Sequence, residues 1–260
     1  MDTLRHEHIE RTHVPPRSDL RMTTPPAQLA AMMRHDLPPQ QAFNYRREAW
    51  LRWLGELPGV TETLEGLPDA VDRAMVAATV EQLIEREQVV PAFVTAMLWG
   101  HGRSNYGPSR TARVLAHASE AKAHSGAEIA SDKLAESVRR ARRDGAVEGY
   151  RYLNNEGHIH GLGPAFFTKW LYFVTARGQA RAARAAPVLD ALVITWLHTD
   201  ADVRLRAGKT PDYQRYVDVL QAWGEPHRLN PVEVEERIFR LIRGDGAAPD
   251  KQMPKRPQSE

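Results

Sequence analysis

Apolar residues recur through most of this 260-residue chain with the spacing of α-helices, and proline opens most of the segments that show it. Proline is tolerated in the first turn of a helix, because the amide hydrogen that it lacks has no partner there. No stretch shows the alternation of a half-buried strand. The chain is therefore predicted to be all-α, with helices over 43–54, 68–87, 91–100, 108–123, 131–143, 145–154, 164–176, 187–197, 211–223 and 231–243.

The two ends of the chain have a different composition from this helical body. Residues 1–40 contain three Pro-Pro pairs, and residues 244–260 are rich in glycine and proline. Because proline fixes φ and donates no hydrogen bond, we expect a flexible arm over 1–40 and a flexible tail over 244–260. The folded domain is predicted to span 41–243.

Several classes of protein are excluded by composition. The chain contains no cysteine, so it forms no disulfide, thiolate nucleophile, cysteine-held zinc site or iron–sulfur cluster. It has no apolar run of membrane-spanning length and no apolar segment near its N-terminus. We expect a monomeric cytoplasmic protein that uses neither a metal nor a cofactor.

Basic residues are concentrated in the middle third of the chain. Residues 101–184 contain 14 Lys and Arg against 7 Asp and Glu, a net charge of +7, whereas the whole chain has a formal net charge of only +2. Such a segment can face a polyanion. The alternative is a solvated helix face, to which the arginines at 139, 140, 142 and 143 would belong.

A glycine-containing turn between two helical segments is the most informative motif. Gly161-Leu162-Gly163 precedes the apolar segment 164–176 and follows His158 and His160. Glycine permits positive φ and close backbone approach, and free amides at a helix N-terminus bind anions such as phosphate. We therefore expect DNA-phosphate contacts from His160, Gly161, Leu162 and Gly163.

Together with its flanking helices, at about 150–176, this turn resembles the helix-hairpin-helix of the DNA glycosylase superfamily that includes endonuclease III and 8-oxoguanine glycosylase. Residues 150–197 most resemble a bacterial group with the 8-oxoguanine DNA glycosylase fold. The segment from Trp99 to Thr111 is similar to a second signature of that group. The resemblance implies two helical subdomains that flank a cleft.

The same resemblance implies a catalytic lysine after the hairpin and a catalytic aspartate about 20 residues later. Lys169 and Asp190, in Pro187-Val188-Leu189-Asp190, lie 21 residues apart and take these roles. Better-known members have the lysine two residues after the second glycine, where this chain has Ala165. Lys169 follows one helical turn later, about 6 Å along the axis.

The residue types suit removal of a base from DNA. A neutral lysine can attack the sugar C1′ to form a Schiff base, and the apolar neighbours of Lys169 would lower its pKa. Asp190, at a helix N-terminus, would stabilise the cationic sugar. The alternatives are a lysine that extends to solvent at a helix edge and an ordinary first-turn acidic residue.

Two further groups of residues remain open to interpretation. The loop after Trp99 supplies base-pocket candidates that could stack on a flipped base or hydrogen-bond to its edge: Trp99, His101, Arg103, Asn105 and Tyr106. The alternative is a capped turn with Trp99 in the core. His158 and His160, next to Glu156, could also supply two ligands to a metal, but no third ligand is evident nearby, and a role in the hairpin is favoured.

We therefore predict a DNA glycosylase, with or without AP-lyase activity, that acts at the nucleoid on double-stranded DNA containing an oxidised or otherwise modified base such as 8-oxoguanine. Three alternatives stay open. They are a non-catalytic helix-hairpin-helix DNA-binding module, a helical interaction scaffold, and a glycosylase for modified bases of phage DNA.

Overall fold

The computed structural model describes residues 24–116 and 123–244, nearly all of them in helices and short connections. The helices are α2 (Ala27–Met32), α3 (Arg47–Leu54), α4 (Val60–Gly66), α5 (Arg73–Glu85), α6 (Val89–His101), α7 (Gly107–Ala116), α8 (Ala123–Asp144), α9 (Ala146–Asn154), α10 (Pro164–Ala176), α11 (Ala191–Ala201), α12 (Thr210–Gly224) and α13 (Pro231–Arg243), with a 3-10 turn at Glu225–His227. These helices confirm the predicted all-α fold class.

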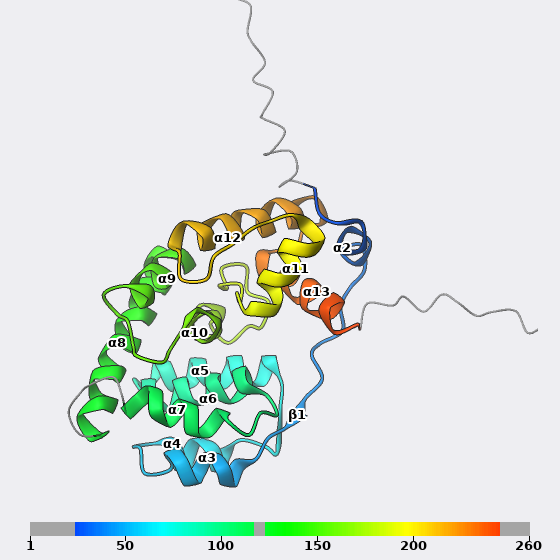
Figure 1. Cartoon of the computed structure of the whole chain (residues 1–260). Coiled ribbons are helices and arrows are strands. Elements are labelled where there is room, and N and C mark those ends of the chain that lie inside the picture. Colours follow the sequence, from blue (N-terminus) through cyan, green and yellow to red (C-terminus); the bar gives the residue numbers. More distant parts are fainter. Residues whose placement is uncertain (1–23, 117–122, 245–260) are drawn as a thin grey trace, which may run out of the picture.

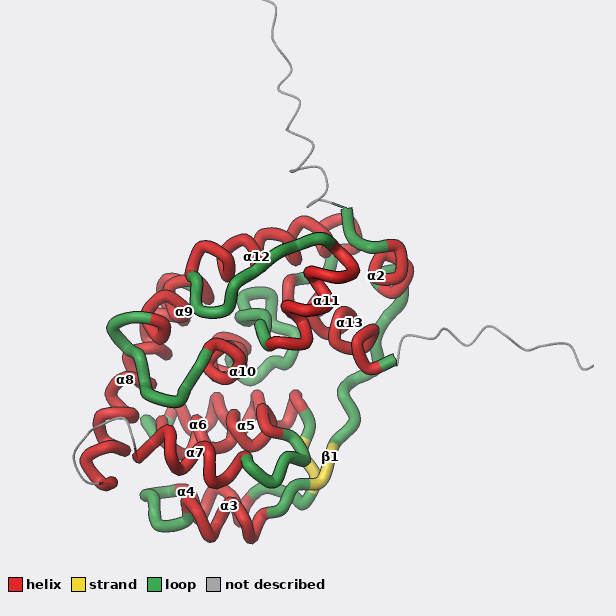
Figure 2. Tube along the Cα trace, in the orientation of Figure 1, coloured by secondary structure: helices red, strands yellow, loops and turns green. Residues whose placement is uncertain are grey.

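Helix α10 lies at the centre of the molecule, between two groups of helices (Figure 1). One group consists of α3 to α7, and the other contains α9 and α11 to α13. Helix α10 packs against α5 and α6 of the first group, α9 of the second, and α8. The loop between α9 and α10 crosses the front of the molecule in Figure 2.

The central helices are apolar on nearly every side. In α10 the run from Trp170 to Val174 is buried, and in α6 every residue from Pro91 to Leu98 is buried. A helix without a polar face must be surrounded by other elements. The two helices meet through Phe93 and Trp170, whose ring centroids lie 5.6 Å apart in an edge-to-face contact.

Several predicted helix boundaries agree with the structure, and others shift by a few residues. The ranges 164–176 and 231–243 are confirmed as α10 and α13. Helices α5 and α11 begin three or more residues later than predicted, because Asp72 and Asp190 cap them and the preceding residues are extended. Helix α4 was not predicted, and α8 is longer than expected.

The segment predicted to begin a helix at Phe43 instead contains a strand. Phe43–Asn44 (β1) pairs antiparallel with Ala70–Val71 (β2), and helix α3 starts only at Arg47. Two residues per strand are too few to produce an alternating pattern, so the sequence gives no sign of this ribbon.

Part of the predicted N-terminal arm belongs to the folded body. Helix α2 packs on α13, with the side chains of Leu29 and Met33 buried. The guanidinium of Arg237 donates to the carbonyl oxygens of Met32 and His35 at 3.3 and 2.8 Å. Proline-rich composition alone did not reveal these contacts. Residues 1–23, the rest of the arm, and residues 245–260 of the predicted tail lie outside the described residues.

We expect Gly149→Ala to destabilise the protein by about 1–2 kcal/mol, as overpacking outweighs the helix propensity of alanine. A Cβ at this position of α9 would lie 2.7 Å from Cβ of Ala141 and 2.8 Å from Cδ2 of Leu171. Gly66→Ala is the matched control, since a Cβ there meets nothing within 4 Å. Urea denaturation measures both, and equal stability of the two variants would contradict the packing of α8, α9 and α10.

Candidate active site

The loop between α9 and α10 is held in place by two buried side chains. Ile159 and Leu162 are 1% and 3% exposed, whereas His160 and Gly161 are exposed. Gly161 has a φ of +81°, which glycine adopts without strain. The hairpin therefore has an apolar inner side and a polar outer side.

Three backbone amides at the turn and in the first turn of α10 have no hydrogen-bond acceptor among the described residues. The amides of Gly161, Gly163 and Ala165 donate no hydrogen bond to any of the described residues. The amide of Leu162 donates to the carbonyl oxygen of Ile159 at 3.0 Å, and the leucine side chain is buried. Of the four predicted phosphate-contact residues, Leu162 is thus an anchor of the turn rather than a donor.

Lys169 lies on α10, partly buried between α10 and α6. Its Nζ donates to the carbonyl oxygen of Gly100 at 3.1 Å and lies 4.9 Å from the ring centroid of Phe166. A Cβ at position 100 would lie 3.1 Å from Cδ of the lysine, so glycine lets the lysine stem lie here without shifting. Burial lowers the pKa of the Lys169 amine, and the carboxylates of Asp190 and Glu235 oppose that shift.

Asp190 is the N-cap of α11. Its Oδ1 accepts hydrogen bonds from the amides of Leu192 and Val193 at 3.0 and 3.1 Å. Its Oδ2 accepts none from the described residues, so this oxygen remains available to another group. The cap fixes the carboxylate at the start of the helix.

The chain leading into Asp190 is fixed against α10 and α12. The hydroxyls of Tyr213 and Tyr216 donate to the carbonyl oxygens of Pro187 and Val188 at 2.9 and 2.8 Å. The amide of Leu189 donates to Oγ1 of Thr168 at 3.2 Å.

Because Thr168 precedes Lys169 and Leu189 precedes Asp190, this hydrogen bond brings the two candidate catalytic residues into one neighbourhood. They form no ion pair among the described residues, but the carboxylate is close enough to raise the pKa of the amine. The family resemblance had implied this proximity, and the hydrogen bond between Leu189 and Thr168 places the two residues in one neighbourhood.

Three polar side chains surround the ring of Phe166 at the first turns of α10. The ring of His101 stacks on it with centroids 4.4 Å apart, and the guanidinium of Arg110 lies 4.8 Å from its centroid. The amine of Lys169 is the third. Burial first, and then the charges of Lys169 and Arg110, lower the pKa of His101 to about 4.

The five base-pocket candidates do not converge. The side chain of Trp99 packs on Tyr172 and Phe173, with centroids 6.2 and 5.1 Å apart, and His101 stacks on Phe166. Arg103 and Asn105 are exposed, as is Tyr106, which is 77% exposed. Asn105 Oδ1 accepts a hydrogen bond from Arg46 at 3.2 Å. The loop predicted as one pocket therefore divides into a buried part and a surface part.

A small hollow lies beside the hairpin, lined by Phe93, Met97, His101, Arg110, Thr111, Val114, Gly161, Leu162 and Phe166. Its volume is about 10 Å³, which accommodates about one water molecule. A nucleobase does not fit this hollow in the observed conformation.

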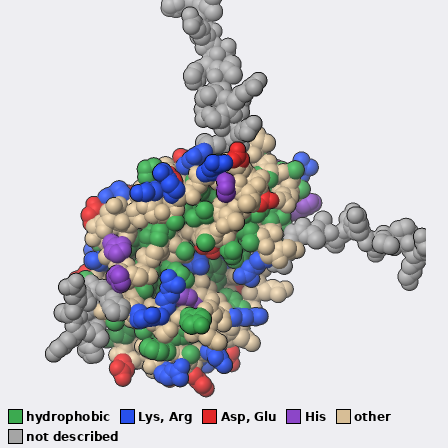
Figure 3. Space-filling model, in the orientation of Figure 1, with side chains coloured by type: hydrophobic (Ala, Val, Ile, Leu, Met, Phe, Trp, Pro, Cys, Tyr) green, Lys and Arg blue, Asp and Glu red, His purple; other side chains and the backbone are tan. Residues whose placement is uncertain are grey.

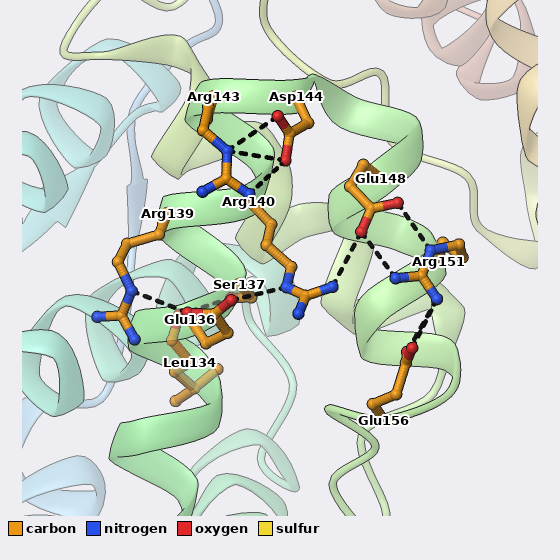
Figure 4. A network of polar contacts seen from close by, with 10 residues as sticks. All are labelled: Leu134, Glu136, Ser137, Arg139, Arg140, Arg143, Asp144, Glu148, Arg151 and Glu156. Atoms are coloured by element: carbon orange, nitrogen blue, oxygen red, sulfur yellow. Dashed lines mark hydrogen bonds and ion pairs between the residues drawn. The ribbon is translucent and has the colours of Figure 1, made fainter.

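Most arginines at the end of α8 form ion pairs with nearby carboxylates. Figure 4 shows a ladder of ion pairs from Arg139 through Glu136, Arg140 and Glu148 to Arg151, with N–O distances of 2.7 to 3.1 Å. Hydrogen bonds from Arg151 and Arg140 lower the pKa of Glu148 to about 2. For these arginines the solvated-face interpretation fits the structure.

The other arginines of this cluster are paired as well. Arg143 pairs with Asp144 at 2.8 Å, and Arg142 pairs with Glu81 and donates to the carbonyl oxygen of Val174. On the face shown in Figure 3, Lys and Arg side chains lie near the middle of the surface as well as along its upper edge over α12 and at its lower edge, while acidic side chains lie mainly toward its margins. Positive charge therefore remains near the hairpin.

A buried ion-pair network, which sequence reasoning missed, joins α5 to α13. Nη1 of Arg73 lies 3.4 Å from Glu235 and 3.1 Å from Glu236, and the guanidinium faces the rings of Trp99 and Tyr172. Burial raises the pKa of Glu235 to about 7, against the effect of Arg73. The sequence signal that could have revealed this network is the carboxylate at position 235, which lies at helical spacing from the apolar residues Pro231 and Ile238.

The structure was also searched for metal-binding clusters and for membrane-spanning helices. In the described ranges, no three His, Asp or Glu side chains group so that they could hold a metal ion, and Glu156 pairs with Arg151 at 2.8 Å. No helix within those ranges is long and apolar enough to span a bilayer.

Comparison with known proteins identifies the family. A family model described as "Putative 8-oxoguanine DNA glycosylase OGG-like protein" matches residues 36–239, and the chain belongs to this family. The match supports an all-α glycosylase-like fold and a role in DNA glycosylase chemistry. Searches of the curated proteins and of the solved structures gave no match.

We expect His101→Phe to reduce the acid sensitivity of the fold. The imidazole pKa is about 4 in the folded chain and about 6.5 unfolded. The folded state therefore binds fewer protons, and its stability falls as the pH drops from about 6.5 toward 4. Thermal unfolding at pH 7.5 and 4.5 should show a smaller difference in Tm for the variant than for wild type.

The matched control for this measurement is His198→Phe, at an exposed position of α11. It should keep the wild-type difference between the two pH values. An unchanged difference in His101→Phe would show that His101 is not held neutral in the fold.

Proposed function

We propose that this protein is a DNA glycosylase that removes an oxidised or otherwise modified base, of the 8-oxoguanine kind, from double-stranded DNA. The observation that carries the proposal is the proximity of the Lys169 amine and the Asp190 carboxylate, with Lys169 on the helix that follows the hairpin. Membership of the OGG-like family supports it.

DNA would bind first at the hairpin. The unpartnered amides of Gly161, Gly163 and Ala165 lie at the N-terminus of α10, where the helix dipole favours a phosphate. His160 and Gly161 are exposed on the outer side of this turn. Exposed Tyr106 and Arg103, on the loop after α6, are suited to contact the duplex beside the flipped nucleotide.

The chemical step would use Lys169 as nucleophile. Its neutral amine attacks C1′ of the sugar, a nitrogen–carbon bond forms, and the N-glycosidic bond breaks with its electron pair leaving on the base. Oδ2 of Asp190 faces the positive charge that develops on the sugar and stabilises it. Loss of a proton from the new ammonium and opening of the sugar ring give a Schiff base, from which the 3′ phosphate can be eliminated.

Borohydride trapping on duplex DNA containing 8-oxoguanine tests this mechanism. The wild-type chain should form a covalent adduct, and Lys169→Ala should form none, because the attacking nitrogen is gone. Asp190→Asn keeps the helix cap and should slow excision by about 10²–10⁴-fold. Gel electrophoresis of the adduct and of cleaved strands gives both results.

Lys133→Ala is the matched control for the trapping experiment. Lys133 donates to the carbonyl oxygen of His158 at 2.7 Å and therefore also contacts the hairpin, but it lies on α8. Its removal should leave trapping intact. Excision without any adduct would remove the lysine mechanism, and salt-sensitive DNA binding without excision of any modified base would favour the non-catalytic binding module.

The rate of adduct formation should rise with pH through a midpoint below the ordinary lysine value of 10.5. Burial lowers the pKa of Lys169, so more of the amine is neutral at a given pH. Asp190 raises this pKa, and Asp190→Asn should therefore move the midpoint further down while lowering the maximum rate. Single-turnover trapping from pH 6 to 10 measures both midpoints, and an upward shift in the variant would contradict the assigned charge interaction.

A further inference from the structure

Arg110, on helix α7, is a basic residue to which the proposed mechanism gives no role. Its side chain is exposed, and its guanidinium forms no hydrogen bond and no ion pair with any of the described residues. The four arginines between 139 and 143 at the end of α8 differ, because each of them pairs with a carboxylate. The positive charge of Arg110 is thus left without a partner in the described part of the chain.

The sequence explains why no neighbouring carboxylate reaches this guanidinium. No Asp or Glu occurs between Glu87 and Glu120, a stretch that contains α6, the loop after it and α7. None occurs between Glu156 and Asp190, a stretch that contains the hairpin and α10. All residues that line the small hollow beside Arg110 come from these two stretches. The elements next to Arg110 therefore offer it no anion of their own.

Arg110 lies beside the hairpin and is held there. It lines the hollow together with Gly161 and Phe166. Val114, one turn further along the same face of α7, touches the turn, since a Cβ at Gly161 would lie 3.5 Å from its Cγ2. The guanidinium lies 4.8 Å from the ring centroid of Phe166, at the range where a cation is attracted to an aromatic face. The structure thus places a fixed positive group next to the glycine turn.

We propose that Arg110 binds a phosphodiester group of the DNA strand that lies on the hairpin. The proposal rests on the proposed glycosylase function and adds a DNA-binding residue from α7 to that site. A guanidinium presents a planar fork of N–H donors that matches two oxygens of a phosphate. Because α7 belongs to one group of helices and the hairpin leads into α10, this contact holds the strand from both elements.

The shape of the site favours a phosphate over a base as the partner of Arg110. The hollow beside the guanidinium has a volume of about 10 Å³, so no base can enter it. The exposed guanidinium can therefore meet only groups on the outside of a duplex. The anionic groups there are the phosphates, whose contacts position a protein without reading sequence.

Two substitutions of Arg110 and one control on the same helix test this role. Arg110→Gln removes the charge, and Arg110→Lys keeps the charge but removes the planar fork. The matched control is Arg113→Gln. Arg113 is also an exposed arginine of α7, but its Nε donates to the carbonyl oxygen of Ser109 at 3.4 Å, and it does not line the hollow. Equal urea midpoints of all four chains would show that the variants keep the fold.

Binding to an unmodified duplex would be measured from about 50 to 300 mM KCl. Arg110→Gln should bind about tenfold more weakly than wild type, as expected for the loss of one hydrogen bond between charged groups. The slope of log K against log salt should fall by about one, because one phosphate is no longer neutralised. Arg110→Lys should keep the wild-type slope with an affinity between those of wild type and Arg110→Gln, and Arg113→Gln should match wild type in both quantities.

The contact should affect binding and leave the chemical step intact. Single-turnover borohydride trapping on a duplex with a preformed abasic site separates the two. For Arg110→Gln the protein concentration at half-maximal rate should rise by about tenfold, whereas the rate at saturation should stay within about threefold of wild type. A large fall in the saturated rate would contradict a role confined to holding the strand.

A second arm distinguishes the DNA backbone from free phosphate. Inorganic phosphate replacing chloride at equal ionic strength should weaken wild-type and Arg110→Gln binding to the same extent, since the lone ion lacks the further contacts of a strand. Stronger competition against wild type than against Arg110→Gln would assign the site to free phosphate and overturn the proposal.

The remaining outcomes separate this proposal from the proposed function. Equal affinity and equal salt slope in wild type and Arg110→Gln would overturn the role of Arg110 and leave the glycosylase standing. A loss that depends on which base lies opposite the modified one would overturn the phosphate assignment, because a phosphate contact weakens binding uniformly. A wild-type chain that neither binds a duplex nor traps the abasic site would remove both proposals.

Discussion

The contact between the amine of Lys169 and the carbonyl oxygen of Gly100, at 3.1 Å, joins the two most apolar helices of the protein. Helices α6 and α10 are buried on almost every side, so a lysine on α10 has few ways to satisfy its polar end. Glycine at position 100 lets the stem of the lysine lie against α6. The burial that stabilises the core also lowers the pKa of the amine. The packing of α6 and α10 therefore also increases the neutral fraction of Lys169.

The interior of the fold also contains a network of buried ion pairs. Arg73, Glu235 and Glu236 join α5 to α13 in the interior; the charge of Glu235 raises the pKa of Lys169, and that of Asp190 raises the pKa of Glu235. Buried charges of this kind are tolerated only when they are paired. Arg73 and Glu236 of this network also line a cavity of about 240 Å³.

Sequence signals predicted the structure correctly where the conformation depends on the backbone preferences of single residues such as proline and glycine. Proline at the first turn located the start of α10 and of α13, and Gly161 has the positive φ expected of the turn before α10. The pair of Lys169 and Asp190 was accessible because a family resemblance supplied the spacing, not because periodicity brings them together. The extended residues before Asp190 were read as helix, since their conformation is fixed by Tyr213, Tyr216 and Thr168 from other helices.

Periodicity, backbone freedom and composition are enough to predict the helical class, the main helices, the glycine turn before α10 and the residue types available for chemistry. The folded molecule is needed to show that residues 24–40 pack on the body, that the α8 arginines are neutralised by nearby carboxylates, and that Gln40, Asp72 and Arg73 line one cavity. Those outcomes depend on contacts between residues far apart in the chain, or on which faces of neighbouring helices meet. Such contacts leave no periodic trace in the sequence.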